Sequence, residues 1–498
     1  MRDYLATEFK ICGDGQTDNT VAINQLINQC SEGGGGTIYF PAGKYLTGPI
    51  KLASYLTIYL AAGAVLFFDD QFDRYTPEKT RWSGYNCYGF SPLLFGSELE
   101  HVAIKGEGTI DGQGKRWWAI NHQLKQGLPF ETAVTRSLKK LNAHLTEAEN
   151  TNLVEWDSQF LRPALLQLFK CRHVKLEGIT LQHSPFWNTH LVYCDNVTIH
   201  DLTILNPADT PNGDGLDLDS CQHVRVANCH FDVGDDCIAI KSGINEDGRQ
   251  TAVPSQNITI TNCSMLHGHG GVVLGSEHSG GIKNVVISNC IFTGTDRGIR
   301  FKTNRERGGY IKQVIASDII VEDCLCPIAI NAFYRYGISE HNTLASEDRW
   351  LPVTEKTPVI SDIKISNLIG RNIVAAAGFI YGLPEMPIRN LQLTNIDIEM
   401  NSENQVGGEP DMVKEELFMS GAGVFAKYVE NLTCSSMRIQ TNESVALTAK
   451  SCNQLLIDNL ETPLNQDHLP VVELEDVDTY TIVGRQYDQR GVNYLATQ

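Results

Sequence analysis

One nine-residue phrase recurs along this chain and constrains its fold more than any other feature. It is clearest in His173-Val-Lys-Leu-Glu-Gly-Ile-Thr-Leu, and it returns from Asn196, His223, Asn257 and Asn284. Fainter copies begin at His101, Gln313, Asp362, Asn390, Asn431 and Gln454. Successive starts lie roughly 22 to 34 residues apart where no insertion intervenes, a period typical of solenoid proteins. We therefore expect one short structural unit, stacked many times.

Each phrase predicts two short strands separated by a sharp turn. Alternation such as Val-Thr-Ile has the two-residue period of a strand with one buried face. The sixth residue of successive copies is Asn or Asp, which tolerate left-handed backbone: Asp201, Asn228, Asn262, Asn289, Asp318, Asn367 and Asn395. Stacked, these side chains would form an asparagine ladder. Cys229, Cys263 and Cys290 follow in register and predict an inward column of small apolar side chains.

This repeat predicts an all-β fold, a right-handed parallel β-helix whose coils stack at about the 4.8 Å spacing between strands. A β-propeller is the alternative, but it needs four antiparallel strands per repeat, and the phrases lack hairpin signals. We expect residues 1–498 to form a single β-helix domain.

Three kinds of segment depart from the repeat. Residues 18–30 predict a helix that caps the first coil. Its expected cap is Asp18 or Thr20, and its expected apolar face is Val21, Ile23, Leu26 and Ile27. Residues 113–160 are polar and helix-prone and predict an insertion packed against the solenoid. Breaks at 336–357 and 399–417 predict loops, which in solenoids often shape a binding cleft.

Composition limits the possible partners and compartment. The net charge of −19 argues against nucleic acid, and an anionic ligand would need a local cationic cluster. No apolar stretch is long enough to span a bilayer, so no membrane partner is expected. The N-terminus shows no secretory signal, and we expect most of the 14 cysteines to be free thiols. These observations favour the cytoplasm, or the periplasm or exterior if a signal was removed; the oligomeric state stays open.

Four short motifs carry charged residues at intervals of about one repeat. They are Asn212-Gly213-Asp214, Gly234-Asp235-Asp236, Gly268-His269-Gly270 and Arg300-Phe301-Lys302. In a β-helix these motifs fall on consecutive coils and on one face. Clustered carboxylates cannot all ionise freely, so one stays protonated as an acid while another acts as a base. That pair is the minimum for hydrolysis of a glycoside, and the cations suit an acidic sugar.

These four motifs, in this order, resemble glycoside hydrolase family 28, the polygalacturonases and related pectin hydrolases. The resemblance is clear from Gly13-Asp14-Gly15 to about Arg335. It implies a catalytic β-helix that hydrolyses α-1,4-galacturonosyl linkages by single displacement with inversion, without metal or other cofactor. Gly213 and Phe301 depart from the family's motifs, which have Thr and an aliphatic residue there. The sequences of residues 235–243 and 275–281 are more similar to those of bacterial exo-polygalacturonases than to those of endo-acting members.

The resemblance also implies roles for individual residues. Asp235 would be the general acid, and Asp214 and Asp236 would hold and deprotonate the attacking water. His269 would support the protonation of the acid or contact the substrate. Arg300 and Lys302 would bind a galacturonate carboxylate.

Further candidates for substrate binding are Asn212 within the first motif, Lys241, Tyr334 and His190. Lys241 follows Asp235 by six residues and is a candidate for a second uronate. His190 lies near Trp187 on the preceding coil, where it either borders the sugar or is packed inside.

Other functions fit parts of the pattern. A rhamnogalacturonan hydrolase of the same family is one alternative, although we expect such enzymes to lack the histidine and the full cation pair. A pectate lyase on the same fold would need calcium held by carboxylates and an arginine base. A β-helix that only adheres to polysaccharide would need no acid–base pair.

Overall fold

The computed structural model of this protein describes residues 2–146, 154–336, 338, 343–403, 406–414, 417–442, 445–462, 471–483 and 494–497. The chain forms two compact units. Unit 1 comprises residues 1–243 and 253–263, and unit 2 comprises residues 244–252 and 264–498. Each is described by itself below, and the single-domain expectation stays a prediction. Within the described ranges, no helix combines the length and apolar character needed to cross a membrane.

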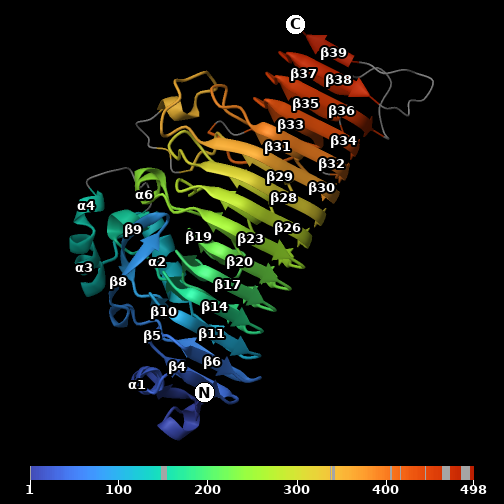
Figure 1. The fold of residues 1–498 in the computed structure, drawn as a ribbon. Helices are drawn as coiled ribbons and strands as arrows, with labels where there is room; N and C mark the ends of the chain where they lie inside the picture. Colours follow the sequence, from blue (N-terminus) through green and yellow to red (C-terminus); the bar gives the residue numbers. More distant parts are fainter. Residues whose placement is uncertain are drawn as a thin grey trace. The chain divides into compact units, whose positions relative to one another are not determined.

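Unit 1 is a stack of parallel coils (Figure 1). One face carries β6 (Leu56–Leu60), β11 (Glu100–Gly106), β14 (Arg172–Glu177), β17 (Asp195–His200), β20 (Gln222–Ala227) and β23 (Ser255–Thr261), each paired in parallel with the next. After the turn the chain continues in β7 (Ala64–Phe68), β12 (Thr109–Asp111), β15 (Thr180–Gln182), β18 (Thr203–Leu205) and β21 (His230–Asp232).

A second parallel sheet closes each coil of unit 1. It contains β5 (Ile50–Lys51), β10 (Leu94–Ser97), β13 (Leu166–Phe169), β16 (Thr189–Val192), β19 (Leu216–Asp219) and β22 (Asp236–Lys241). The chain enters the stack through β1 (Arg2–Leu5), η1 (Ala6–Phe9), β2 (Asp14–Asp18), β3 (Gly36–Phe40) and β4 (Gly43–Thr47).

Unit 2 repeats this architecture. Its longer strands pair in parallel in the order β26 (Ile282–Thr293), β28 (Tyr310–Glu322), β30 (Val359–Ile373), β32 (Arg389–Met400), β34 (Asn431–Gln440), β36 (Gln454–Glu461) and β38 (Thr479–Val483). β24 (Ser264–Leu266) pairs with β26.

The second sheet of unit 2 contains β25 (Gly270–Gly275), β27 (Arg297–Lys302), β29 (Cys326–Asn331), β31 (Ala376–Tyr381), β33 (Ala422–Lys427), β35 (Leu447–Lys450), β37 (Val472–Glu475) and β39 (Tyr494–Thr497). The short helices α6 (Asn245–Thr251) and η3 (Thr343–Ser346) also belong to this unit. The prediction of an all-β parallel β-helix is confirmed.

Left-handed turn residues set the register of the coils, as the sequence predicts. All seven Asn and Asp residues at the sixth repeat position have φ between 52° and 59°. In unit 1 the Asn262 amide donates to Asn228 Oδ1 at 3.3 Å. In unit 2 Asn395 donates to Asn367 at 2.8 Å, and Asn367 donates to Asp318 at 3.0 Å. The side chains therefore bond coil to coil in the expected asparagine ladder.

Inside each unit, aliphatic side chains stack in columns. Val197, Val224 and Ile258 occupy successive coils of unit 1, and each is at most 1% exposed. The chain's 14 cysteines are all free thiols, and all but Cys12 are buried. Phe301 is fully buried, as expected of an inward residue. The cysteines thus act as small apolar side chains.

The predicted first helix is α1 (Thr20–Glu32), with two differences of detail. Asn19 occupies the position before the helix, while an Asp18 oxygen accepts from the Thr20 amide at 3.0 Å. Val21 is 69% exposed, so its place on the buried face is wrong. Ile23, Leu26, Ile27 and Cys30 form that face instead.

The expected insertion is helical and is preceded by a hairpin that the sequence analysis missed. The helices are α2 (Lys115–Lys125), α3 (Ala133–Leu141), α4 (Ala143–Thr146) and α5 (Val154–Ser158); residues 147–153 of the predicted insertion lie outside the described residues. The hairpin pairs β8 (Pro77–Trp82) with β9 (Tyr85–Phe90), and η2 (Phe72–Arg74) precedes it. In Figure 1 the hairpin and helices lie together beside the coils of unit 1.

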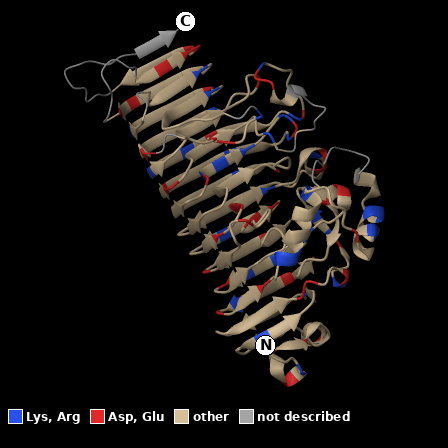
Figure 2. Cartoon of the chain, turned by 180° about the vertical axis from the view of Figure 1, so that it is seen from behind, with Lys and Arg blue, Asp and Glu red and all other residues tan. Residues whose placement is uncertain are grey.

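Lys and Arg are interspersed with Asp and Glu in both units (Figure 2). This distribution agrees with the net charge of −19.

Candidate active site

In unit 1, three carboxylates meet where two neighbouring coils begin their second-sheet strands. Asp214 lies two residues before β19, and Asp235 and Asp236 lie at the start of β22. One carboxylate oxygen from each lies within 4.8 Å of the others. Asp214 and Asp236 are 2% and 1% exposed, and Asp235 is half-buried. The structure thus brings together the three carboxylates that the motifs predict.

Glycines make this close approach possible. A Cβ atom at Gly215 would lie 2.5 Å from the carbonyl oxygen of Cys237 on the next coil. A Cβ atom at Gly234 would lie 2.7 Å from the carbonyl oxygen of Pro207. Both distances are too short for any other residue, so these two motif glycines hold the carboxylate-bearing turns against their neighbours.

The cluster shifts the acidity of its members. Burial raises the pKa of Asp214 well above its ordinary value, and the charges of Asp235 and Asp217 raise it further. The ammonium group of Lys241 acts in the opposite direction. Burial and the neighbouring carboxylates therefore favour the protonated form of Asp214, and Lys241 favours its ionised form.

Lys241 lies among these carboxylates. Its Nζ atom is 3.1 Å from Asp217 Oδ1, 3.6 Å from Asp214 Oδ2 and 3.6 Å from the centre of the Trp187 ring. The side chain is 4% exposed. The ammonium group thus lies between protein carboxylates, and the expectation that Lys241 reaches a second uronate stays a prediction. Three close carboxylates are also a geometry that a divalent cation accepts, but here Lys241 supplies positive charge beside them.

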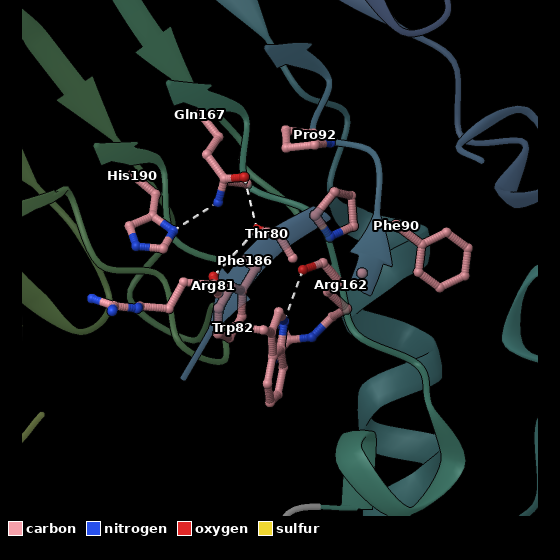
Figure 3. Close-up of a pocket in the computed structure, with 12 residues that line it drawn as sticks. Thr80, Arg81, Trp82, Phe90, Pro92, Arg162, Gln167, Phe186 and His190 are labelled. Carbon is pink, nitrogen blue, oxygen red and sulfur yellow. Dashed lines mark hydrogen bonds between the residues drawn. The ribbon is translucent and has the colours of Figure 1, made fainter. Parts of the chain in front are cut away.

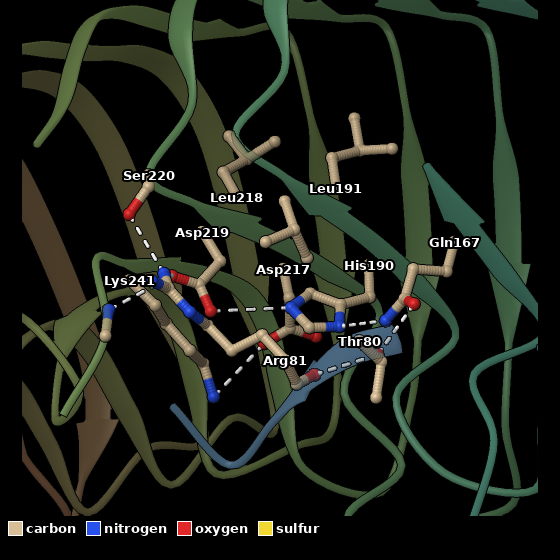
Figure 4. A network of polar contacts seen from close by, with 12 residues as sticks. Thr80, Arg81, Gln167, His190, Leu191, Asp217, Leu218, Asp219, Ser220 and Lys241 are labelled. Atoms are coloured by element: carbon tan, nitrogen blue, oxygen red, sulfur yellow. Dashed lines mark hydrogen bonds and ion pairs between the residues drawn. The ribbon is translucent and has the colours of Figure 1, made fainter. Parts of the chain in front are cut away.

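A buried polar network continues from Lys241 across the outer face of the second sheet of unit 1 (Figure 4). Arg81 of the hairpin donates to Asp219 Oδ1 at 2.5 Å and to Ser220 Oγ at 2.9 Å. Burial would raise the pKa of Asp219, but Arg81 and His190 outweigh it, and the pKa is lowered. The hairpin thereby covers polar side chains that would otherwise face solvent.

His190 belongs to this network and is 2% exposed. Its Nδ1 atom lies 2.9 Å from Gln167 Nε2, and its Nε2 atom lies 3.5 Å from Asp219 Oδ2. Burial lowers its pKa, so the ring is neutral at pH 7. Of the two placements expected for His190, the structure shows the packed one, because the hairpin encloses the ring.

A small pocket lies under the hairpin (Figure 3). Its lining combines Thr80 and Trp82 of the hairpin with Arg162, Gln167 and His190. The indole N–H of Trp82 donates to the Arg162 carbonyl at 3.1 Å, and Thr80 donates to Gln167 at 2.7 Å. The pocket is therefore part of the packing that fixes the hairpin.

Asn212 is also held by the protein. Its side-chain oxygen accepts from an Arg162 amino group at 2.9 Å, and Arg162 in turn bonds Glu155 at 2.7 Å. The backbone of Asn212 is left-handed, with φ of 53°. Asn212 therefore shapes the turn before Asp214, and its contact with the sugar stays a prediction.

In unit 2, the predicted cations lie with Tyr334. The charged groups of Arg300 and Lys302 lie 5.6 Å and 5.5 Å from the centre of its ring. Arg300, Lys302 and Tyr334 are 1%, 6% and 6% exposed. An Arg300 amino group donates to the backbone carbonyl of His269 at 3.2 Å, so His269 belongs to the same group of residues.

Asp411 is the residue of this group that the sequence analysis missed. Its Oδ1 atom accepts from Arg300 Nε at 3.0 Å, and the carboxylate is fully buried. Burial raises the pKa of Asp411, but Arg300 and Arg297 more than offset this and the pKa is lowered. Arg297 also donates to the carbonyl of Pro410 at 3.2 Å. The segment around Asp411 is thus fastened to β27.

Comparison with known proteins agrees with this arrangement. The sequence profile described as Glycosyl hydrolases family 28 matches residues 150–407, which is more than half of the chain. The chain belongs to glycosyl hydrolase family 28. A second profile, described as Rhamnogalacturonase A/epimerase, pectate lyase-like, matches residues 6–73.

Relatives in this family carry both exo and endo names. A "Probable polygalacturonase" of Vitis vinifera is 30% identical over 91% of this chain and 84% of its own length. An "Endo-polygalacturonase" of Pectobacterium carotovorum is 28% identical over 63% of this chain and 72% of its own. A solved "hyperthermoactive Exopolygalacturonase" from Thermotoga maritima has 31% identity and a TM-score of 0.68, covering 80% of this chain and 87% of that one.

Proposed function

We propose that this protein hydrolyses α-1,4-galacturonosyl linkages in polygalacturonate and pectic oligosaccharides. The observation that carries the proposal is the cluster of Asp214, Asp235 and Asp236, with one oxygen of each within 4.8 Å of the others, at the motif positions of a family 28 chain. Relatives named polygalacturonase support galacturonan as the substrate.

In this proposal the half-buried Asp235 is the general acid that protonates the leaving oxygen. Asp214 and Asp236 bind the attacking water and take its proton. Arg300 and Lys302 bind a galacturonate carboxylate beside Tyr334, and His269 assists the acid or the sugar. No metal or other cofactor takes part.

We further propose that the enzyme is exo-acting and removes galacturonate from chain ends. The similarity to the Thermotoga maritima exopolygalacturonase supports this, as does the resemblance of the sequence of residues 275–281 to exo-acting members. The 14 free thiols support a reducing compartment, and we propose a cytoplasmic enzyme that acts on oligosaccharides.

The test is the product profile on polygalacturonate early in the reaction, for the wild type and Asp235→Asn. We expect monomer or dimer from the start, and a loss of about 10²- to 10⁴-fold in rate for Asp235→Asn. Asp458→Asn is the matched control, since Asp458 is exposed on β36, and it should keep full rate. A ladder of intermediate oligomers would refute exo action, and full activity of Asp235→Asn would refute the acid.

A rhamnogalacturonan hydrolase is the second candidate, because the profile matching residues 6–73 carries that name. Rhamnogalacturonan backbone should be included as a substrate in the same assay. Faster release from that polymer than from polygalacturonate would favour this candidate. An unsaturated product and loss of activity with a chelator would instead indicate a calcium-dependent lyase.

A further inference from the structure

Lys241 and Asp217 form a buried ion pair directly beside the proposed base. β19 and β22 pair so that Asp217 lies opposite Ala239, and Asp219 lies opposite Lys241. Successive strand residues point to opposite faces of a sheet. Leu218 and Ile240 are fully buried in the core, so Asp217 and Lys241 lie on the outer face, where the Nζ–Oδ1 distance is 3.1 Å (Figure 4).

The ammonium group of Lys241 lies in an enclosed setting. The side chain is 4% exposed, and that of Asp217 is fully buried. The Trp187 ring lies against Nζ, with its centre 3.6 Å away. Burying a charge without partners is very unfavourable, so the contacts with Asp217 and Asp214 are what allow a charged lysine here. A lysine this enclosed has little reach toward a sugar outside the cluster.

The charges acting on Asp214 have opposite signs. Asp235, Asp217 and Asp236 favour its protonated form, and Lys241 at 3.6 Å favours its ionised form. If Asp214 were protonated, it could not accept a proton from water. A side chain that favours its ionised form therefore matters for the chemistry.

We propose that Lys241, held by Asp217 against Asp214, is a positioning residue that favours the ionised form of Asp214 against the burial and the neighbouring carboxylates that favour its protonated form. This inference rests on the proposed function for its catalytic meaning. In this role Lys241 acts through Asp214. Asp217 orients the ammonium group and shares its charge, so it limits how strongly Lys241 acts on Asp214.

The test is the pH profile of kcat and KM for Lys241→Met, which keeps an unbranched side chain only one atom shorter and removes its charge. An opposite charge at this distance lowers a carboxyl pKa by about 1–3 units. Removing it should therefore move the acid limb of kcat/KM to higher pH by about 1–3 units, with kcat reduced and KM changed less than about threefold. Lys175→Met is the control, because Lys175 pairs with Glu177 at 2.7 Å on the exposed face.

A second variant should shift the acid limb of the pH profile in the opposite direction. Asp217→Asn removes a negative charge beside Asp214 and frees Lys241 to act on it more strongly, so the acid limb should move to lower pH. Limbs that shift in opposite directions in the two variants support the proposal. An unmoved acid limb with a raised KM in Lys241→Met would overturn it, because that result means a direct substrate contact.

A titration without substrate separates this inference from the proposed function. Carboxyl ¹³C NMR of aspartate-labelled protein, with Asp214→Asn to assign the resonance, should give a higher midpoint for Asp214 in Lys241→Met. If that midpoint rises but the wild type cleaves no galacturonan, the substrate proposal fails and the role of Lys241 stands. If the midpoint does not move, the role of Lys241 fails regardless of activity.

Discussion

The buried pair between Arg81 and Asp219 makes a sharp prediction about what holds the hairpin over the coils. Both side chains are fully buried, and the Nη1–Oδ1 distance is 2.5 Å. Arg81→Met leaves the Asp219 carboxylate enclosed without its main counter-charge. Removing one partner of a buried ion pair costs about 3–5 kcal/mol, so we expect a loss of that size in the free energy of unfolding of unit 1 at pH 7.

The loss should depend on pH with a definite sign. In the folded wild type the pKa of Asp219 is lowered, so ionised Asp219 stabilises the fold. This stabilisation is complete above the pKa of Asp219 in the unfolded chain, about 3.9, and is lost as the pH falls through its pKa in the folded protein. Without Arg81, burial raises the pKa of Asp219 in the folded protein above its pKa in the unfolded chain. The folded variant is therefore destabilised only at pH values where Asp219 would be ionised. The difference between wild type and variant should therefore be largest near pH 7 and shrink toward pH 4.

Tryptophan fluorescence during urea unfolding is a suitable assay. Five of the chain's six tryptophans lie in unit 1: Trp82, Trp117, Trp118, Trp156 and Trp187. Arg116→Met is the control, because Arg116 and Asp70 are 50% and 46% exposed at 3.3 Å, and exposed pairs contribute about 0–1 kcal/mol. A loss below about 1 kcal/mol for Arg81→Met, or an equal loss at pH 4 and pH 7, would refute the reasoning.

Three further predictions concern other parts of the fold. Native protein should react rapidly with a thiol reagent at Cys12 alone, because the other 13 cysteines are buried; several fast thiols would contradict this. Asn367→Ala should lower the stability of unit 2 by about 1–2 kcal/mol, and Asn367→Gly should lower it by less. Both variants lose the ladder bonds, but glycine adopts the left-handed backbone of residue 367, whose φ is 52°, more easily than alanine. Equal losses would show that the backbone conformation contributes nothing. Asp411→Asn should cost about 3–5 kcal/mol in thermal or urea unfolding, because Arg300 loses its buried partner, whereas a change below about 1 kcal/mol would show that the pair is dispensable.

The parts of the structure that the sequence predicts are those set by local rules. Asn and Asp at the sixth repeat position mark left-handed turns, and alternation marks the strands, so the coils and the carboxylate cluster follow from spacing alone. Long-range partners carry no such mark. Arg81 meets Asp219 across 138 residues, and Arg300 meets Asp411 across 111.

The same limit applies to two buried polar residues. Lys241 and His190 look like exposed polar residues on an outer face, and their burial follows from residues distant in sequence: Trp187 for Lys241 and the hairpin for His190. That hairpin carries one local signal, the two-residue Ser83-Gly84 turn between strand-like segments, which sequence analysis could have used. The position at which the hairpin packs against the coils depends on tertiary contacts, which no local sequence pattern predicts.

The stereochemistry of the first product tests the account most directly. One carboxylate oxygen of each residue lies within 4.8 Å of the others, closer than the about 6.5–9.5 Å usual between the two carboxyl groups of inverting enzymes. Inversion is nevertheless expected, because three carboxylates are present and two of them can hold the water while the third protonates the leaving oxygen. Proton NMR during cleavage of a defined α-1,4-galacturonate trimer by the wild type should show the β anomer first. The α anomer as the first product would contradict the account.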